Sequence, residues 1–368
     1  MQTNPLIKDT SYLRHFWHPV CSLQELEMAS PTGLGPLAVT LLSEHLVVAK
    51  LGGRIVAMRD RCPHRSAKLS GGKVVGDDLQ CPYHGWQYRA DGSCSHIPAL
   101  PEGPIPAKAR VERFECEERY GLIWVRLDSS YDCTEIPFFS AANDPKFKII
   151  IQEPYYWKSS AERRWENFTD FSHFAFVHPK TLFDPNAAQP PLVPMDRING
   201  QFRFVYDTPK GMEVNKLAII GKFSYICSMP FAIDLSSLKY SDNTTSVLFN
   251  VSCPVSDTET KNYFIFAREK HDDSDWPHIS FNNLVFAEDK PIIESESPQY
   301  IPDDEVSVVT DKVSTQYRKW LRELEAAAKE GKEAFKKALH GRAIESDRTY
   351  ALPPGFVALR SRAQGFAS

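Results

Sequence analysis

Four residues in the first quarter of the chain have the types and the spacing of metal ligands. Cys62 and His64 lie in RCPHRSAKLS, and Cys81 and His84 lie in QCPYHGWQYR, with sixteen residues between the two pairs. Thiolate and imidazole ligands together favour either a tetrahedral zinc ion or an iron–sulfur centre. Zinc sites usually place cysteine with cysteine and histidine with histidine, whereas here each cysteine has its own histidine.

The mixed pairs suit a Rieske [2Fe–2S] centre, in which two cysteines hold one iron and two histidines hold the other. Each loop would then give one ligand to each iron. Pro63, Pro82 and Gly85 fit tight loops whose backbone N–H groups approach the cluster sulfurs. A zinc site and four unrelated residues are the alternatives. We expect an electron-transfer cluster, which needs an acceptor for its electrons.

A second group of possible ligands lies in WENFTDFSHFAFVHPKT, and it could be that acceptor. Asn167, Asp170 and His173 follow at intervals of three, so a continuous helix would carry them on one face. His178 precedes a proline, where helical backbone is disfavoured, so we expect the helix to end or bend there and to turn His178 toward His173. Two such histidines invite the 2-His-1-carboxylate site of non-haem Fe(II) oxygenases. Asp170 could accept the second ring N–H of His173.

Both motifs, in this order and separation, resemble the oxygenase component of Rieske non-haem iron oxygenases. Within that family the chain is similar to bacterial methylxanthine N-demethylases over nearly its full length, for example in YLRHFWHPVC, LVVAKLGG, AERRWENFTDFSHFAFVHP and FAEDKPIIES. The resemblance implies a [2Fe–2S] cluster, a mononuclear Fe(II) and O₂ as co-substrate. It also implies a third, carboxylate ligand: Asp289 matches the family position, and Glu288 and Glu294 are the alternatives. Without the resemblance, this segment could be a solvated acidic helix end.

The family also implies a ring of subunits and an external source of electrons. Its matching Asp bridges to a Rieske histidine of the next chain, so Asp170 would meet His84 of the partner subunit and link the two metal sites for electron transfer. We expect a homotrimer, or a trimer mixed with a related subunit. A helix cap or an ion pair with Arg163 or Arg164 is the alternative for Asp170. Because no dinucleotide fingerprint and no plant-type ferredoxin spacing occur, a separate NAD(P)H-dependent reductase is implied.

The reaction implied by the resemblance is oxidative N-demethylation of a methylxanthine-type heterocycle, at the N1-methyl group of caffeine or theophylline, with release of formaldehyde. If 275–290 is a helix that ends at Asp289, residues three, four and seven positions earlier share its face and face the metal. Asn167 is expected near the iron. Five residues are expected to contact the substrate: Phe168, Phe174, Asn282, Val285 and Phe286. Core packing is the alternative for these residues. O-demethylation of an aryl methyl ether and a non-catalytic electron carrier are the alternative functions.

The elements that must position these residues divide the chain in two. Short β-favouring segments with Gly and Pro turns run over 36–125, with a hairpin signal at Gly52-Gly53. They predict an all-β Rieske domain over 1–135, followed by a linker over 129–145.

The remainder, 136–368, mixes extended segments with helices. One helix is expected over about 275–294, and another from about 303, with six residues on one face: Val306, Val309, Val313, Tyr317, Trp320 and Leu324. Strands covered by helices predict an α+β catalytic domain with an antiparallel, helix-grip-like sheet. The segment after Pro354 has no pattern that predicts a structure.

Composition excludes several other classes. The hydrophobic fraction of 42% suits a globular protein, and a net charge of −4 gives little support for a nucleic-acid or membrane partner. No apolar run is long enough to span a bilayer, and the first residues do not form a signal peptide. Eight cysteines are too few for a disulfide scaffold in a chain of 368 residues, so we expect a reducing, cytoplasmic location.

Overall fold

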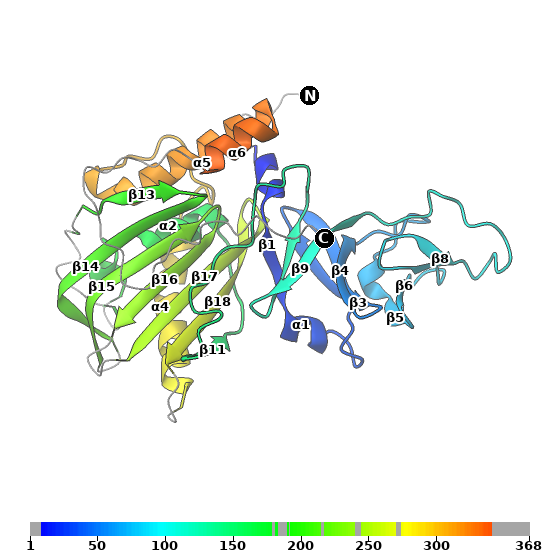
Figure 1. The fold of residues 1–368 in the computed structure, drawn as a ribbon, viewed down its shortest axis with the longest axis horizontal. Coiled ribbons are helices and arrows are strands. Elements are labelled where there is room, and N and C mark those ends of the chain that lie inside the picture. Colours follow the sequence, from blue (N-terminus) through cyan, green and yellow to red (C-terminus); the bar gives the residue numbers. More distant parts are fainter. Residues whose placement is uncertain are drawn as a thin grey trace, which may run out of the picture.

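The computed structural model describes residues 9–178, 181–182, 190, 192–214, 217–239, 244–269 and 274–340. Two β-rich bodies lie side by side (Figure 1), and the strands of each sheet are antiparallel. The longer helices lie on the larger body, and the smaller body has the short helix α1 (Leu23–Met28). The predicted α+β fold, with an all-β first part, is therefore confirmed. None of the helices in the described part of the chain has the length and apolar character needed to cross a membrane.

The first body is built on a six-stranded sheet in the order β1-β10-β9-β4-β3-β2. Its strands are β1 (His18–Ser22), β2 (Leu37–Leu41), β3 (Glu44–Leu51), β4 (Arg54–Arg59), β9 (Arg113–Arg119) and β10 (Leu122–Arg126). A short helix, α1 (Leu23–Met28), follows β1. The expected hairpin joins β3 to β4, and Gly52 and Gly53 both have positive φ angles, of 55° and 77°. A two-residue turn of this kind favours glycine because side chains are strained there.

A smaller, four-stranded sheet is inserted between β4 and β9. It consists of β5 (Lys73–Val75), β6 (Asp78–Gln80), β7 (Gln87–Tyr88) and β8 (Cys94–His96). Its own apolar core contains Leu69, Leu79 and Tyr88, which are fully buried against residues of β3 and β4. The small sheet is therefore a rigid support for the two loops that carry the Cys-His pairs, at the end of the molecule farthest from the second body (Figure 1).

The second body is an eight-stranded sheet in the order β11-β18-β17-β16-β15-β14-β13, with β12 also paired to β18. Its strands are β11 (Phe147–Ile151), β12 (Tyr155–Trp157), β13 (Met195–Ile198), β14 (Gln201–Val214), β15 (Leu217–Ser228), β16 (Ala232–Lys239), β17 (Thr245–Ser256) and β18 (Glu259–Glu269). The helices are α2 (Ala161–Thr169), α3 (Phe174–Val177), α4 (Trp276–Ile293), α5 (Lys312–Glu330) and α6 (Lys332–His340). Helices α2 and α4 lie against one face of the sheet, and α5 and α6 lie along the β13 edge (Figure 1).

The two bodies share one hydrophobic core. Leu122, Trp124 and Val125 of β10 pack in the same cluster as Phe249 of β17 and Tyr263 of β18, and all five are fully buried. Two backbone hydrogen bonds, from residues 42 and 43 to carbonyl groups at the end of β17, add to this contact. The expected linker, 129–145, contains neither a helix nor a strand. The first body is thus fixed against the second along a packed interface.

Two predicted helices have different bounds in the structure. Helix α4 continues to Ile293, so Asp289 lies one turn before its end and not at the end. Helix α5 begins at Lys312, and Val306 and Val309 are 93% and 70% exposed before it. The stretch before α5 is rich in valine, which has a low helix propensity, and Val308 has extended backbone. The side chain of Asp311 accepts a hydrogen bond from the N–H of Val308 and so caps the turn that leads into the helix. The other four residues of that predicted face are buried.

Candidate metal centres

The two Cys-His loops have the same backbone hydrogen-bond pattern. The N–H of Cys62 donates to the carbonyl of the fifth residue after it, at 2.8 Å, and the N–H of Cys81 does the same. The carbonyl of each cysteine accepts from the fourth residue after it, which is Ser66 in one loop and Gly85 in the other. Both of these residues have positive φ angles, of 58° and 72°. The two loops therefore have the same backbone framework, although His64 follows its cysteine by two residues and His84 by three.

The four side chains fit a two-iron cluster. Cys62 and Cys81 are buried, while the rings of His64 and His84 lie nearer the surface with centroids 4.6 Å apart. His64 Nδ1 is buried and has no hydrogen-bond partner among the described residues. A buried nitrogen without a partner is costly, and a metal bond would satisfy it. The hydroxyl of Tyr88 lies 3.1 Å from the Sγ of Cys62, where a hydrogen bond to sulfur would influence the potential of the cluster.

The second group of ligands is positioned by a break between two helices. The prediction of one helical face was wrong, because α2 ends at Thr169 and Asp170 has extended backbone (ψ 138°). The Asp170 carboxylate accepts hydrogen bonds from the N–H groups of Ser172, at 2.9 Å, and His173, at 3.3 Å. Aspartate often caps a new helical turn in this way, and here the turn leads into α3. The helical backbone ends again at His178, as expected from the proline that follows.

Three ligand atoms converge where α2, α3 and α4 meet. His173 Nε2 lies 3.2 Å from His178 Nε2, and Asp289 Oδ1 lies 3.5 Å and 3.1 Å from these two nitrogens. Among the described residues, these are the only three His, Cys, Asp or Glu side chains grouped closely enough to hold one metal ion. The donor set is the 2-His-1-carboxylate set of non-haem iron enzymes. The residues present therefore fit a mononuclear Fe(II).

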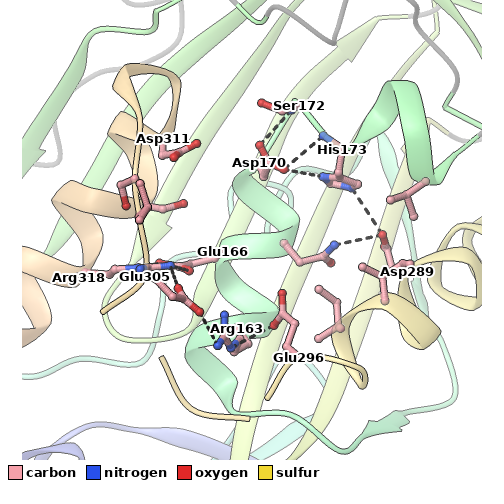
Figure 2. A pocket seen from close by; sticks show the side chains of 17 residues that line it. Arg163, Glu166, Asp170, Ser172, His173, Asp289, Glu296, Glu305, Asp311 and Arg318 are labelled. Atoms are coloured by element: carbon pink, nitrogen blue, oxygen red, sulfur yellow. Dashed lines mark hydrogen bonds and ion pairs between the residues drawn. The ribbon is translucent and has the colours of Figure 1, made fainter. Parts of the chain in front are cut away.

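A carboxylate lies behind each histidine. His173 Nδ1 is 3.1 Å from Asp170 Oδ2 (Figure 2), and His178 Nδ1 is 3.0 Å from Glu288 Oε2. Because carboxylates only accept, each Nδ1 carries a proton toward its carboxylate, and loss of the Nε2 proton frees the lone pair that a metal would bind. Glu288, an alternative ligand in the sequence analysis, thus orients His178 instead. Glu294, the other alternative, accepts from the backbone N–H of Lys158.

The electrostatics of this site favour a cation. Burial lowers the pKa of His173, but hydrogen bonds with Asp170 and Asp289 outweigh this effect and raise it to about 9. Burial alone would raise the pKa of Asp289, but hydrogen bonds from both histidines hold it well below its usual range. Both shifts show that positive charge is stabilised between the three atoms, and a metal ion supplies that charge once the ring nitrogens are deprotonated.

The other predicted residues surround the site as follows. The amide Nδ2 of Asn167 donates to Asp289 Oδ1, at 3.1 Å. The ring of Phe174 lies 4.8 Å from that of His173. Asn282, Phe286 and Asp289 share the buried face of α4, and Asn282 Nδ2 is buried without a hydrogen-bond partner among the described residues. Phe286, Val285 and Phe168 belong to one apolar cluster over β18.

A polar cavity of about 380 Å³ opens on the Asp170 side of the site. Its lining includes His173 and Asp289 together with Glu166, Glu305 and Arg318, but none of the five predicted substrate residues (Figure 2). The alternative of an ion pair between Asp170 and a neighbouring arginine is not what the structure shows. Arg163 pairs with Glu296 and Glu305 instead, and Arg164 turns inward toward Asn167.

Residues that the sequence analysis missed come from distant segments. Tyr155, on β12, binds the side chain of Arg164, and Thr181 donates to Glu288. No motif marks either residue. The one signal in the sequence for carboxylates near the histidines is the adjacent pair Glu288-Asp289. In the structure, Asp289 faces both Nε2 atoms and Glu288 binds Nδ1 of His178.

Comparison with known proteins agrees with this geometry. Residues 16–115 match the Rieske [2Fe-2S] domain, and residues 157–327 match the vanillate O-demethylase oxygenase C-terminal domain. The methylxanthine N1-demethylase NdmA of Pseudomonas putida is 70% identical over 342 residues, which are 93% of this chain and 97% of that protein. The N3-demethylase NdmB of the same organism is 46% identical over 352 residues, or 94% and 99% of the two chains.

Solved structures give the same result. NdmA with caffeine superimposes with a TM-score of 0.89 at 70% identity, covering 92% of this chain and 99% of that one. Dicamba monooxygenase bound to dicamba, at 21% identity and a TM-score of 0.72, shares the fold. The chain therefore belongs to the methylxanthine N-demethylases, a group within the Rieske non-haem iron oxygenases. It is an oxidoreductase that uses a Rieske cluster, a mononuclear iron and O₂.

Proposed function

We propose that the enzyme removes the N1-methyl group of caffeine or theophylline as formaldehyde. The observation that carries this proposal is the 70% identity to an N1-demethylase, against 46% to an N3-demethylase. In the net reaction, the N-methyl compound, O₂, two electrons and two protons give the N–H product, formaldehyde and water. The mononuclear iron, when bound, supplies the activation of O₂.

The proposed ligands are those that the loops and helices bring together. Four residues hold the [2Fe–2S] cluster: Cys62, His64, Cys81 and His84. Three hold the iron: His173, His178 and Asp289. Around them, Asp170 and Glu288 fix the two histidine rings, and buried apolar side chains limit the access of water. The ligands and the carboxylates behind the histidines would keep each metal site in a fixed geometry. The apolar wall would hold the substrate methyl group near the iron.

The substrate contact with the most support is the amide of Asn282. Its Nδ2 is a buried donor without a partner among the described residues, and a xanthine carbonyl or ring nitrogen can accept from it. Phe286 and Val285, one turn along α4, would support the flat ring through apolar contact. Phe168 and Phe174 would complete the wall on the side of the histidines.

Product analysis tests the reaction directly. The purified enzyme would be given NAD(P)H, a matched reductase, and caffeine, theophylline or vanillate in separate reactions. We expect formaldehyde and the N1-demethylated product from the two xanthines, and none from vanillate. The match to the vanillate O-demethylase domain makes O-demethylation the second candidate, and formaldehyde from vanillate alone would establish it. An electron carrier would give no formaldehyde from any of the three.

Electrons would enter from a separate reductase and cross between subunits. The cavity beside Asp170 is rich in carboxylates, while the exposed cations Arg61 and Arg65 flank the first Cys-His pair in the sequence. Opposite charges of this kind guide docking of one surface on the other. We propose a trimeric ring, of identical subunits or mixed with a related one, in which His84 of the partner subunit meets Asp170.

All eight cysteines are unpaired, which supports the expected cytoplasmic location.

A further inference from the structure

A buried arginine lies behind the proposed iron site without a carboxylate partner. Arg164, on α2, is fully buried, and its guanidinium lies 4.7 to 5.6 Å from four aromatic ring centroids: Tyr155, Trp157, Phe168 and Phe286. A buried arginine usually pairs with a carboxylate, because removing an isolated charge from water is costly. In the described part of the chain, no carboxylate forms an ion pair with it. The positive charge of Arg164 is therefore compensated by contacts other than an ion pair.

The hydrogen bonds of Arg164 lead to a proposed iron ligand. Nε and Nη2 donate to the hydroxyl of Tyr155, at 2.9 and 2.6 Å, and Asn250 donates to the same oxygen, at 3.0 Å. Nη1 donates to Oδ1 of Asn167, at 3.0 Å. The other end of that amide, Nδ2, donates to Oδ1 of Asp289, at 3.1 Å. One hydrogen-bonded chain thus joins the guanidinium to the carboxylate.

This chain fixes the orientation of the Asn167 amide. A guanidinium only donates and a carboxylate only accepts, so a single orientation of the amide satisfies both neighbours. In the opposite orientation, the amide NH₂ would face Arg164 and the amide oxygen would face Asp289, and both contacts would be repulsive. Asn167 and Asp289 are 9% and 4% exposed, so water cannot readily replace a lost partner.

We propose that Arg164 is a positioning residue for the iron site. Through Asn167 it keeps an N–H donor on Oδ1 of Asp289, the oxygen that faces both histidine Nε2 atoms. The inference rests on the proposed iron ligands. A role in packing the aromatic wall alone would stabilise the fold but would not act through Asn167. The two roles can be separated, because effects that pass through one intermediate residue do not add.

The experiment compares Arg164→Met in the parent enzyme and in an Asn167→Leu background. Holoenzyme is mixed anaerobically with ferrozine, and the rate at which the mononuclear Fe(II) is lost is measured while visible absorption follows the Rieske cluster. Each single variant should release iron about 10- to 100-fold faster than the parent, as expected for loss of a group that orients a metal ligand. The double variant should release it no faster than Asn167→Leu alone, and the Rieske absorption should stay unchanged.

Two further variants keep the test decisive if Arg164→Met does not fold. Arg164→Lys retains a charged donor and should hold iron within a few-fold of the parent, whereas the neutral Arg164→Gln should release it faster. Arg163→Met is the matched control: it removes another buried charge from α2, but one that pairs with Glu296 and Glu305 and not with Asn167. It should lower the melting temperature without changing iron release.

Two results would overturn the inference. Parental iron release in a folded Arg164 variant without the charge, or additive effects of the Arg164 and Asn167 changes, would show that Arg164 only packs. A parent enzyme with no iron accessible to ferrozine, at full Rieske content, would instead overturn the proposed iron site itself.

Discussion

His173 touches several parts of the proposed machinery at once. Its Nε2 faces Asp289 and His178, its Nδ1 binds Asp170, and its ring packs on Phe174. The ring therefore links the proposed iron site to the proposed route of electron entry. By contrast, the ligands of the cluster lie in loops of the first body, beside a different apolar core. Changes at His173 should thus affect one metal and spare the other.

His173→Ala should remove one of the three irons per chain and abolish demethylation. Visible absorption and the [2Fe–2S] signal in electron paramagnetic resonance should remain at parental intensity, because no cluster ligand is altered. Cys62→Ala is the complementary variant and should lose that signal. Iron analysis per chain and a formaldehyde assay provide the measurements. Turnover at the parental rate in His173→Ala would disprove the assignment of the site.

Asn282→Leu should reduce turnover of theophylline roughly five- to 150-fold, since a lost hydrogen bond to a buried group costs about 1–3 kcal/mol. Both metals should be retained, because Asn282 binds neither in our assignment. Exchange of Phe286 for a smaller apolar residue should change which N-methyl group of the substrate lies near the iron. Chromatography of the demethylated products measures this change. Parental rate and regiochemistry in both variants would show that these residues only pack the core.

At the scale of elements, the spacing of the ligands in the sequence predicted the iron site better than the expected helix boundaries did. The interval from His173 to His178 and the following proline predicted their approach, which depends only on local backbone. The interval from Asn167 to His173 suggested one helix, but Asp170 caps a new turn and breaks it. Arg164 could not be interpreted from sequence, because its partners Tyr155 and Asn250 come from β12 and β17. Contacts between distant segments leave no periodic signal.

The linker between the two sheets is held by a buried carboxylate that should titrate. Asp234, on β16, accepts from the N–H and the hydroxyl of Ser140, but burial dominates and raises its pKa to about 7. The unfolded chain loses this proton near pH 4, so between pH 4 and 7 the folded chain binds more protons and this group makes stability fall as pH rises.

Asp234→Asn should therefore gain in melting temperature relative to the parent as the pH increases from 4 to 7, with no further relative gain above about pH 8. Differential scanning fluorimetry over this range measures the difference at each pH. Asp144→Asn, at a partly exposed site of the same linker, is the control and should show no such trend. A difference independent of pH would mean that Asp234 stays ionised throughout.

At the scale of the whole molecule, the proposed ring predicts complementation between two inactive variants. His84→Ala lacks a cluster ligand, and Asp170→Asn lacks the carboxylate that is proposed to bridge the two metal sites. Alone, each should be inactive. Co-expressed, they form rings in which an intact His84 of the partner subunit meets an intact Asp170, so part of the activity should return. The assay is formaldehyde release, with sedimentation to establish the oligomer. No recovery in mixed oligomers would place electron transfer within one chain.

The common core of the two bodies has a consequence for how the enzyme responds to dilution. Trp124 and Phe249 lie in one packed cluster, so the cluster loops cannot swing on a hinge toward α2 of their own chain, from which Figure 1 shows them well separated. In the proposed ring, reduction of the iron would then require that a second chain be bound. Specific activity should consequently depend on protein concentration around the dissociation constant of the ring, while metal content per chain stays constant.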